Sequence, residues 1–249
     1  MINKKVISDI VSKYSLSNNI EKVKWTITDK KLLIHFINPS KNLSGYIDYR
    51  KEIGLKPGDY GIFNTSTLIK MLNILDGDIL IDTTSKNGQA VELKMADTNY
   101  DIKFNLANPN VTPETPNFND PALNDESFKV SFKITDEFIT RFVKSKDALS
   151  ELETFTIETR EGFTGEELVF TVGTNITSTI EFVVDDATIN ESFGAIPFDS
   201  NLFKEILKAN KDYHSGEIRI NPKGIIDVHL HCGNDLYTGY YLVRKQENN

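Results

Sequence analysis

The chain has 249 residues, of which 39% are hydrophobic, and its formal net charge at pH 7 is -8. This length allows one large domain or two of ordinary size, and the acidic balance does not suggest an obvious binder of nucleic acid. The single cysteine, Cys232, excludes an internal disulfide, and the sequence has neither an apolar run long enough to span a membrane nor the apolar core of a signal peptide at its start.

The first half of the sequence contains two segments with helical spacing of apolar residues, and alternating strands surround them. Asn64 or Thr65 can cap the second helix, and Gly77 is its expected stop. The buried stripe of this helix is expected at Leu68, Met71, Leu72 and Leu75. The helices are expected at residues 3–14 and from about residue 65, the strands at 23–27, 32–36, 43–49, 79–81, 91–95 and 100–106, and a turn at 55–59.

Residues 107–125 read ANPNVTPETPNFNDPALND and hold four of the eight prolines of the chain. Proline lacks a backbone donor and fixes φ, so neither a helix nor a central strand can run through this stretch. Unstructured loops of this length are uncommon inside a compact domain, which favours a linker. The sequence therefore predicts a first domain at residues 1–107, a connector at 108–126 and a second domain at 127–249.

After the linker the same order of elements returns, with a strand near residues 128–134 and a helix at 136–145. When Ile2 is placed on Ile134, four apolar positions of the first helix, Val6, Ile7, Ile10 and Val11, fall on Phe138, Ile139, Phe142 and Val143. Each copy is interpreted as a helix, three strands, a second helix and three more strands. Such a unit buries a pair of helices against one face of an antiparallel sheet, so the expected fold class is α+β with two similar domains.

Charge is distributed unevenly between the expected helices and the rest of the chain. The four helices carry ten basic and six acidic residues, a net of +4, while the remainder carries -12. A mildly basic face suits salt-sensitive contacts to phosphates that do not depend on base sequence, and few aromatic residues are present there to stack on single strands. The candidate DNA-binding residues are Lys4, Lys5, Lys13, Lys70, Arg141, Lys144, Lys146, Lys204, Lys208 and Lys211.

Three stretches, together with the repeat and the position of the linker, resemble the two-domain DNA sliding clamps, the family of proliferating-cell nuclear antigen and the clamps of tailed phages. KMADTNYDIKF at residues 94–104 is similar to the last strands of a clamp first domain, and FDSNLFK at 198–204 to the start of the last inner helix. GYYLVRK at 239–245 is similar to the clamp C-terminus. The chain departs from the family in lacking a full opening strand and in having Val243 and Arg244 where the eukaryotic clamp has an Ala-Pro step.

The resemblance implies the DNA-clamp fold, in which a head-to-tail homotrimer closes a ring around duplex DNA. It implies a non-enzymatic processivity factor that needs no cofactor and has a DNA polymerase and a clamp loader as partners. The single cysteine favours a reducing compartment, so we expect the protein in the cytoplasm. Lys, Asn and Ile are abundant, which fits an AT-rich viral genome, and the cytoplasm would then be that of a host.

The resemblance also implies two protein interfaces. Ring closure would pair the strand at 100–106 of one copy with residues 175–184 of the next. The expected subunit-interface residues are Tyr100, Ile102, Phe104, Thr179, Ile180 and Phe182. Partner peptides would enter an apolar pocket beside the connector and the C-terminal strand, where Tyr241 is expected to face outward because its neighbour Tyr240 faces the core. The expected partner-binding residues are Val111, Phe118, Leu123, Tyr241, Leu242 and Val243.

Two other functions stay open. One is a monomeric processivity factor of the same double fold that binds DNA by charge alone, and the other is a structural assembly protein built from duplicated αβ units. No nucleotide-binding or nucleophile motif is present, so an enzyme is least favoured. His229 and His231 share a strand face, but Cys232 points to the other face and no second ligand pair is near, so we expect no metal site.

Overall fold

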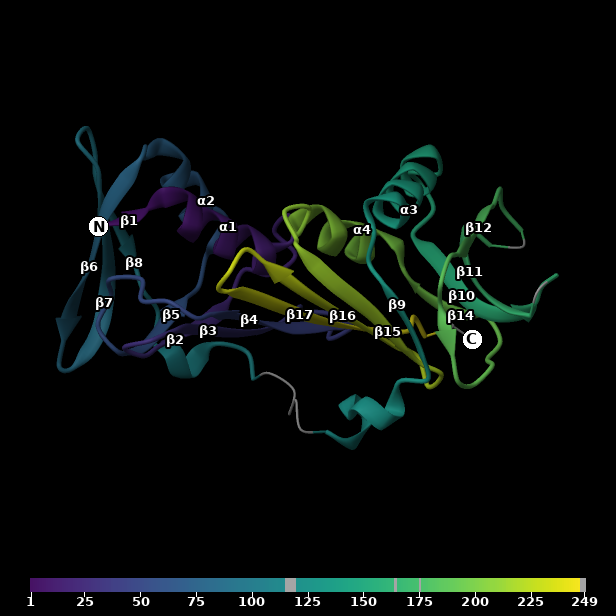
Figure 1. The fold of residues 1–249 in the computed structure, drawn as a ribbon. Helices are drawn as coiled ribbons and strands as arrows, with labels where there is room; N and C mark the ends of the chain where they lie inside the picture. Colours follow the sequence, from purple (N-terminus) through teal and green to yellow (C-terminus); the bar gives the residue numbers. More distant parts are fainter. Residues whose placement is uncertain (115–119, 164, 175, 247–249) are drawn as a thin grey trace. The chain divides into compact units, whose positions relative to one another are not determined.

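A computed structural model describes residues 1–246 apart from 115–119, 164 and 175. The chain divides into two compact units (Figure 1): unit 1 comprises Met1–Pro116 and Gly233–Thr238, and unit 2 comprises Asn117–Cys232 and Gly239–Asn249. The main division falls within the expected connector, but residues 233–238 belong to unit 1 although the sequence assigns them to the second domain. The α+β class expected from the sequence is confirmed, because each unit combines two α-helices with antiparallel strands.

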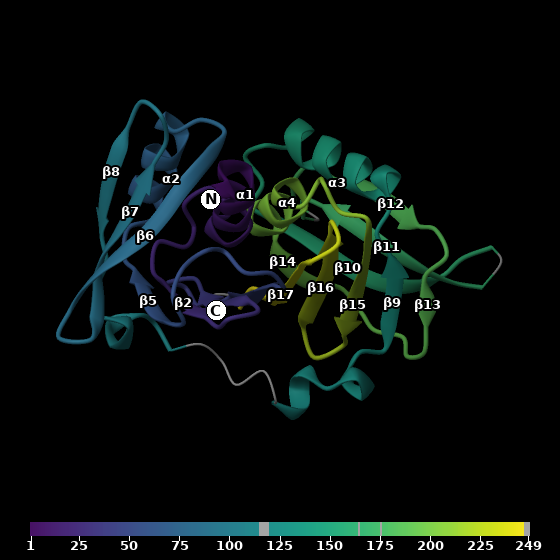
Figure 2. The same cartoon turned by 60° about the vertical axis from the view of Figure 1, so that its left-hand side comes forward.

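Unit 1 has two layers, with helices on one side of its strands. Its strands follow the orders β1-β6-β7-β8 and β4-β3-β2-β5, and α1 lies beside α2 (Figure 2). The elements are β1 (Ile2–Asn3), α1 (Lys4–Ser15), β2 (Val23–Ile27), β3 (Leu32–Ile37), β4 (Leu43–Tyr49), β5 (Gly58–Ile62), α2 (Thr65–Ile74), β6 (Asp78–Lys86), β7 (Gln89–Ala96), β8 (Asp101–Asn105) and the 3-10 helix η1 (Pro109–Val111).

Side chains set the ends of both helices in unit 1. The Asn3 side chain accepts a bond from Lys5 N at the start of α1, and the Asn64 side chain accepts one from Thr67 N at the start of α2. Caps of this kind typically contribute about 1 kcal/mol each. Of the two expected caps for α2, Asn64 and Thr65, the structure has Asn64. In the expected stripe of α2, Leu68, Leu72 and Leu75 are buried and Met71 is only half-buried.

The expectation of three strands between the helices is wrong for both units, because unit 1 has four and unit 2 has five, counting the two-residue strand at Thr188–Ile189. In unit 1, the missed strand is β5, whose sequence GDYGI begins in the segment expected to be a turn. Two of its five residues are glycines, which leave no side chains to mark the period of two. Position 61 requires glycine because a Cβ there would lie 2.5 Å from the carbonyl oxygen of Ala107, the point at which the connector starts.

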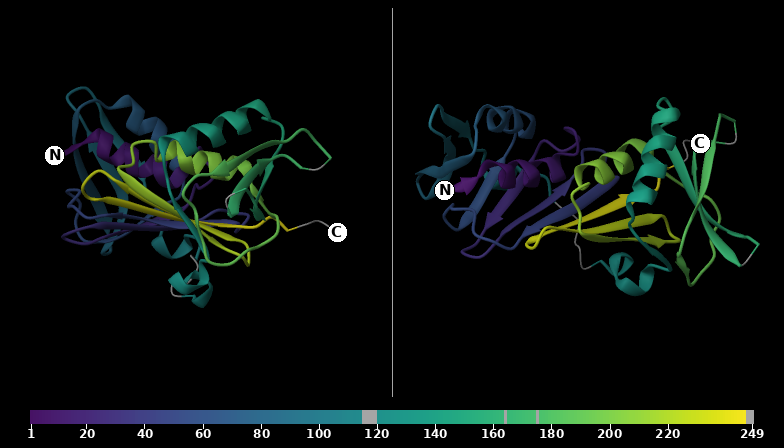
Figure 3. Two further views of the ribbon diagram at one scale, coloured as in Figure 1. Left: turned by 45° about the vertical axis from the view of Figure 1, so that its right-hand side comes forward. Right: turned by 45° about the horizontal axis from the view of Figure 1, so that its top comes forward.

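Unit 2 repeats this plan, with strand orders β12-β11-β10-β14 and β13-β9-β15-β16-β17, and α3 lies beside α4 (Figure 3). Leu236–Thr238 of β17 group with unit 1. The elements are the 3-10 helices η2 (Pro121–Leu123) and η3 (Asp125–Ser127), then β9 (Val130–Lys133), α3 (Asp136–Ala148), β10 (Thr154–Glu161), β11 (Glu166–Val172), β12 (Ile180–Val184), β13 (Thr188–Ile189), β14 (Ile196–Asp199), α4 (Ser200–Ala209), β15 (Ser215–Asn221), β16 (Ile225–Cys232) and β17 (Leu236–Val243).

The core of unit 2 is a cluster of phenylalanines between its helices and the β10–β12 strands. Phe142 packs edge-on against Phe155 and Phe203, with centroids 5.0 and 4.7 Å apart. Phe170 stacks on Phe155 at 5.8 Å. Such pairs contribute about 0.5–1.5 kcal/mol beyond the area they bury, so they fix both helices on the sheet. None of the described helices is long and apolar enough to cross a membrane.

Candidate functional site

Each four-stranded sheet ends in a five-residue strand that pairs with another strand on one side only. This strand is β8 in unit 1 and β12 in unit 2, and the sheets also end at β1, β5, β13 and β14. β12 is shorter than the expected strand at 175–184, because residues 176–179 form a turn and coil, and Asn175 lies outside the described residues. An open edge presents a row of backbone donors and acceptors that a second chain can pair with.

The six residues expected at the subunit interface lie on or beside these two strands. Tyr100 is 51% exposed and Thr179 is exposed, while Phe104 is buried in its own unit. The others, Ile102, Ile180 and Phe182, are half-buried. A cavity of about 500 Å³ adjoins β12 in unit 2, and Phe138, Phe182 and Val184 contribute its apolar lining.

Arg141, expected to contact DNA, is held by neighbours in unit 2. Its guanidinium donates to the carbonyl oxygen of Val183 and to Asp185, both at 3.2 Å, and it also pairs with Glu137. Two carboxylates therefore compensate its charge. On the next turn of α3, Lys144 is exposed and makes no ion pair with any described residue.

Two of the ten expected DNA-binding residues are not available at the surface. Lys13 is 1% exposed and Lys146 is 2% exposed, so the expectation of an exposed basic face is wrong at both positions. The ammonium of Lys146 donates to the carbonyl oxygen of Ser150 at 2.6 Å, beyond the end of α3. Helix ends leave carbonyl groups without intrahelical partners, and lysine can bond to them while its aliphatic stem is buried.

The other candidates differ in how free their charges are. Lys70, Lys208 and Lys211 are exposed, but Lys211 follows the end of α4 at Ala209 and is not helical as expected. Lys5 pairs with Asp9 at 2.7 Å. The ammonium of Lys4 donates to the carbonyl oxygen of Leu75. Lys204 pairs with Asp147, and this hydrogen bond lowers the pKa of Asp147. Among the ten, Lys70, Lys144, Lys208 and Lys211 thus combine exposure with the absence of an ion pair to any described residue, and the first three of them lie in helices.

The first part of the connector is seated on unit 1. Ala107 N donates to the carbonyl oxygen of Gly61 at 2.9 Å, and the Asn108 side chain caps η1. Val111 is 57% exposed. A mainly apolar hollow of about 430 Å³ lies beside Pro113, between the connector and the loop after β3.

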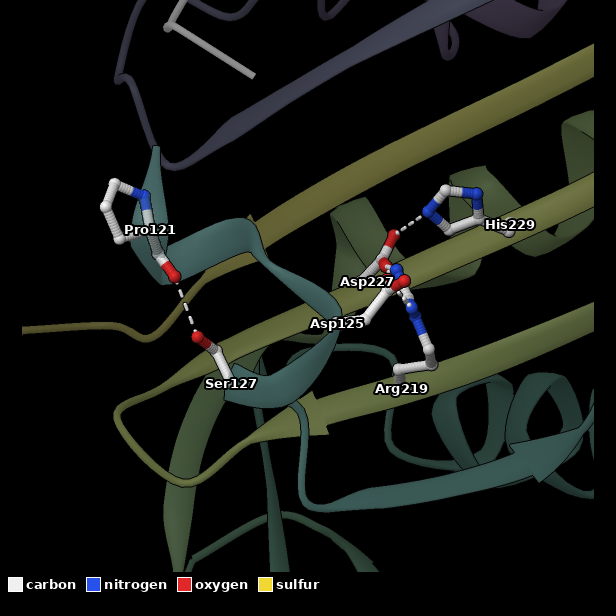
Figure 4. A network of polar contacts seen from close by, with 6 residues as sticks. All are labelled: Pro121, Asp125, Ser127, Arg219, Asp227 and His229. Carbon is white, nitrogen blue, oxygen red and sulfur yellow. Dashed lines mark hydrogen bonds and ion pairs between the residues drawn. The ribbon is translucent and has the colours of Figure 1, made fainter. Parts of the chain in front are cut away.

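The second part of the connector is tied to unit 2 by a polar network (Figure 4). Arg219 on β15 reaches Asp125 of η3 at 2.5 Å and Asp227 of β16 with two nitrogens, at 2.9 and 2.5 Å. The ring of His229 lies 2.6 Å from the other carboxylate oxygen of Asp227. Asp227 is fully buried, whereas 89% of the Asp125 side chain is exposed. We call the contact between Arg219 and these two carboxylates the connector latch.

The latch keeps charges paired where the connector meets the sheet. The hydrogen bond and charge of Arg219 lower the pKa of Asp125. Although burial opposes it, Asp125 and Asp227 together raise the pKa of Arg219. None of the three was singled out from the sequence. Arg219 and Asp227 are directly opposite in the β15–β16 register, so an assigned hairpin would have revealed the opposite-charge pair.

The C-terminal strand β17 is more buried than the sequence predicts. Tyr240 and Tyr241 are both buried, at 0% and 7% exposed, so the prediction that Tyr241 faces outward is wrong. Tyr241 packs edge-on with His229, and Tyr240 accepts a hydrogen bond from Asn210 at 2.8 Å. Leu242 is also fully buried and Val243 is 39% exposed. Leu123 of η2 is half-buried, and Phe118 lies outside the described residues.

Solved structures with the same arrangement of elements are clamps. Proliferating cellular nuclear antigen (PCNA) from Entamoeba histolytica matches with a TM-score of 0.70 and 17% identity, over 98% of this chain and 96% of that one. PCNA from A. fulgidus, bound to the C-terminal region of FEN-1, matches with a TM-score of 0.75 and 11% identity, over 100% and 98%. The chain has the PCNA fold. A PCNA2–PCNA3 complex from Sulfolobus tokodaii also matches, with a TM-score of 0.66, 17% identity and 98% of each chain covered.

Sequence comparison alone does not reveal the PCNA fold. A scan of protein-family models finds no match, and a search of curated proteins finds none either. Low identity spread over nearly the whole length means that the fold is kept while individual residues differ. The likeness therefore establishes the PCNA fold, and any role of a particular side chain rests on the geometry of this chain.

Proposed function

We propose that the chain is a non-enzymatic DNA sliding clamp, a homotrimeric ring that encircles duplex DNA and tethers a replicative DNA polymerase. The observation that carries the proposal is that β8 in unit 1 and β12 in unit 2, at the ends of the two four-stranded sheets, each pair with another strand on one side only. Pairing of unlike edges is a head-to-tail contact, and such contacts close into rings when the rotation allows.

The test of this function combines mass with topology. In solution the particle should have about three times the 28.2 kDa mass of the chain. Once loaded, it should stay on nicked circular DNA in high salt and slide off after the DNA is cut, because retention is topological. A monomer that stimulates a polymerase only in low salt would favour the charge-binding alternative, and a trimer that no DNA retains would favour a structural assembly protein.

Contact with DNA in this proposal is loose. Lys70, Lys144 and Lys208 are exposed helix residues whose charge no described carboxylate pairs with. Point charges of this kind attract phosphates without reading bases, and tight binding would hinder sliding. The remaining helix cations contribute less because burial or ion pairs already engage them.

Partner binding would use the connector and the residues around it. Within unit 1, the hollow beside Pro113 and the exposed Val111 offer apolar surface for a short peptide, and in unit 2 Val243 is an exposed apolar residue. The A. fulgidus PCNA structure contains the C-terminal region of FEN-1, which supports the view that a chain of this fold can take a peptide partner. A polymerase and a clamp loader are the partners that we propose.

A further inference from the structure

The first part of the connector crosses the outward face of the β2–β3 strand pair in unit 1. It starts at the edge strand β5, where Ala107 N donates to the carbonyl oxygen of Gly61 at 2.9 Å (Figure 2). Both β2 and β3 bury every second residue, because successive side chains of a strand point to opposite faces. Lys24 and His35 are directly opposite each other in the register and belong to the outward set. The connector therefore passes over a polar strip of the sheet.

Two hollows lie between these outward side chains and the connector. The first has a volume of about 410 Å³ and mainly polar walls, to which Lys24 and His35 contribute. The second is the mainly apolar hollow of about 430 Å³ beside Pro113, and Ile37 is part of its wall. Pro113 and Glu114 line both hollows, so the two adjoin under the connector. We call the two hollows together the connector groove.

The connector groove is basic although the chain as a whole is acidic. Its lysines and carboxylates are Lys22, Lys24, Lys41, Glu21 and Glu114. Three cations minus two carboxylates leave a net charge of +1, whereas the formal net charge of the chain is -8. Glu21 is already engaged at the start of α2, because its carboxylate accepts from Ser66 N at 3.0 Å. A local field of this sign attracts anionic groups whatever the net charge of the whole chain.

Lys24 and His35 are the groups in the groove that best suit an anion. Burial lowers the pKa of His35, and the charges of Lys24 and Lys31 lower it further, so positive charge already surrounds this ring. The ammonium of Lys24 lies 3.6 Å from a carboxylate oxygen of Asp59, beyond normal hydrogen-bonding distance, and both side chains are 46% exposed. Asp59 also accepts from the hydroxyl of Thr26 at 2.8 Å. An ammonium has three donor hydrogens, so Lys24 can take a further acceptor.

We propose that the connector groove binds a polymerase peptide that carries a side-chain carboxylate in addition to an apolar anchor. This inference rests on the proposed function and adds the chemistry that selects the peptide. An Asp or Glu of the peptide contacts Lys24 and His35, and an aliphatic or aromatic side chain packs against Ile37 and Pro113. Glu114 stands where the two hollows meet and repels an acid placed there, so the carboxylate is directed to the Lys24 end of the groove.

A double-mutant cycle between chain and peptide tests this contact. The probes are the labelled C-terminal peptide of the cognate polymerase and the same peptide with every Asp and Glu replaced by Asn and Gln. The wild type should bind the acidic probe about threefold to fivefold more tightly than the amide probe, as expected for an exposed ion pair. Lys24→Glu should weaken the acidic probe about tenfold or more and leave the amide probe within about twofold. Fluorescence anisotropy gives the affinities.

Two further variants control this experiment. Lys24→Gln should show the same selectivity with a smaller effect, because it removes the charge without reversing it. Lys30→Glu makes the same reversal at the exposed turn of the same hairpin, outside the groove, and should not separate the two probes. Circular dichroism and sedimentation verify that each variant has the fold and the mass of the wild type.

The outcomes separate this inference from the proposed function. Equal weakening of both probes by Lys24→Glu, or of neither, would overturn the carboxylate contact and leave the polymerase partner in place. Tight binding by a polymerase peptide that has no Asp or Glu would do the same, as would selectivity that arises only when a serine of the probe is phosphorylated. A wild-type chain that binds neither probe would overturn the polymerase partner and this inference with it.

Discussion

The guanidinium of Arg141 lies against the end of the open strand β12, with Nη1 3.2 Å from the carbonyl oxygen of Val183 and 3.2 Å from a carboxylate oxygen of Asp185. A helix residue thus bonds to the backbone of the strand that we propose as an interface. The carbonyl oxygen has two lone pairs, so it can accept from Arg141 and from a second chain together. Arg141 is better placed to stiffen this edge than to attract phosphate.

Arg141→Ala should therefore weaken the ring and barely change DNA dependence. Exposed pairs of this kind contribute about 0.2–1 kcal/mol each, so trimer dissociation should shift by a few-fold. Lys144→Ala on the next turn should leave the trimer intact and lower the salt slope of DNA-dependent polymerase stimulation by up to about one unit. A salt titration beside sedimentation measures both. The opposite outcome, with Arg141→Ala changing the salt slope and not the mass, would return Arg141 to the DNA-binding set.

Proline substitutions should separate ring closure from folding. Ile102 bonds inward to β7, so Ile102→Pro removes a bond within unit 1 and should lower the melting temperature. Leu106 N donates to Val91 O in the β7–β8 register, so even-numbered residues of β8 bond to β7 and Lys103 directs its N–H outward. Lys103→Pro should therefore give monomers with little change in thermal stability. Calorimetry and sedimentation on the two variants give the measurements. Equal loss of stability in both would show that the assignment of inward and outward positions on β8 is wrong.

The connector latch should be testable without disturbing the core. Arg219→Ala would leave the buried Asp227 without its arginine partner, and such a loss typically costs about 3–5 kcal/mol. The substitution is therefore made at the exposed carboxylate of the latch, Asp125. Asp125→Asn should speed amide exchange at Leu123, Asn124, Ser127 and Phe128, whose N–H groups close the turns of η2 and η3. Glu126→Gln, at the neighbouring exposed carboxylate, is the control and should exchange like the wild type.

The latch should also be insensitive to pH near neutrality. Arg219 lowers the pKa of Asp125, so the folded state favours the ionised carboxylate. The resulting contribution is present above the unfolded pKa of about 4 and is lost only as pH falls through the lower folded value. Exchange at η3, corrected for intrinsic rates, should thus be the same at pH 8 and pH 5. A marked loss of protection between these values would show that the ionisation of Asp125 does not control the latch.

Sequence periodicity predicts the repeated plan of this fold because amphipathic helices and alternating strands carry their own signal. Asn64 is a cap in both the prediction and the structure, and β4 has its predicted bounds. Periodicity fails where side chains give no alternation, as in the glycine-containing β5. It also fails where tertiary contacts decide burial: Lys146 bonds to a carbonyl beyond its helix, and Tyr241 is covered although its neighbour Tyr240 already faces the core. The latch joins residues 94 positions apart, which no local pattern reveals.

The last prediction concerns the proposed partner peptide, and the burial of the C-terminal strand changes how to test it. A charged residue at Tyr241 would enter the core and unfold unit 2, so it cannot distinguish loss of binding from loss of fold. Val111 and Val243 are 57% and 39% exposed, so Val111→Glu and Val243→Glu should leave the ring intact. Each should weaken binding of the cognate polymerase's C-terminal peptide about tenfold or more, since burying a valine side chain contributes about 1.5–3 kcal/mol.

Tyr241→Phe is the control for this experiment, because it keeps the buried ring and removes only the hydroxyl. It should bind the peptide like the wild type. Fluorescence anisotropy with the labelled peptide gives the affinity, and sedimentation of the same samples verifies the trimer. If both glutamate variants remain trimeric and bind the peptide with unchanged affinity, neither valine lines the site and the peptide must enter elsewhere. The hollow beside Pro113 is then the next place to test, with Ile37→Glu, because Ile37 lines that hollow and lies outside the buried core.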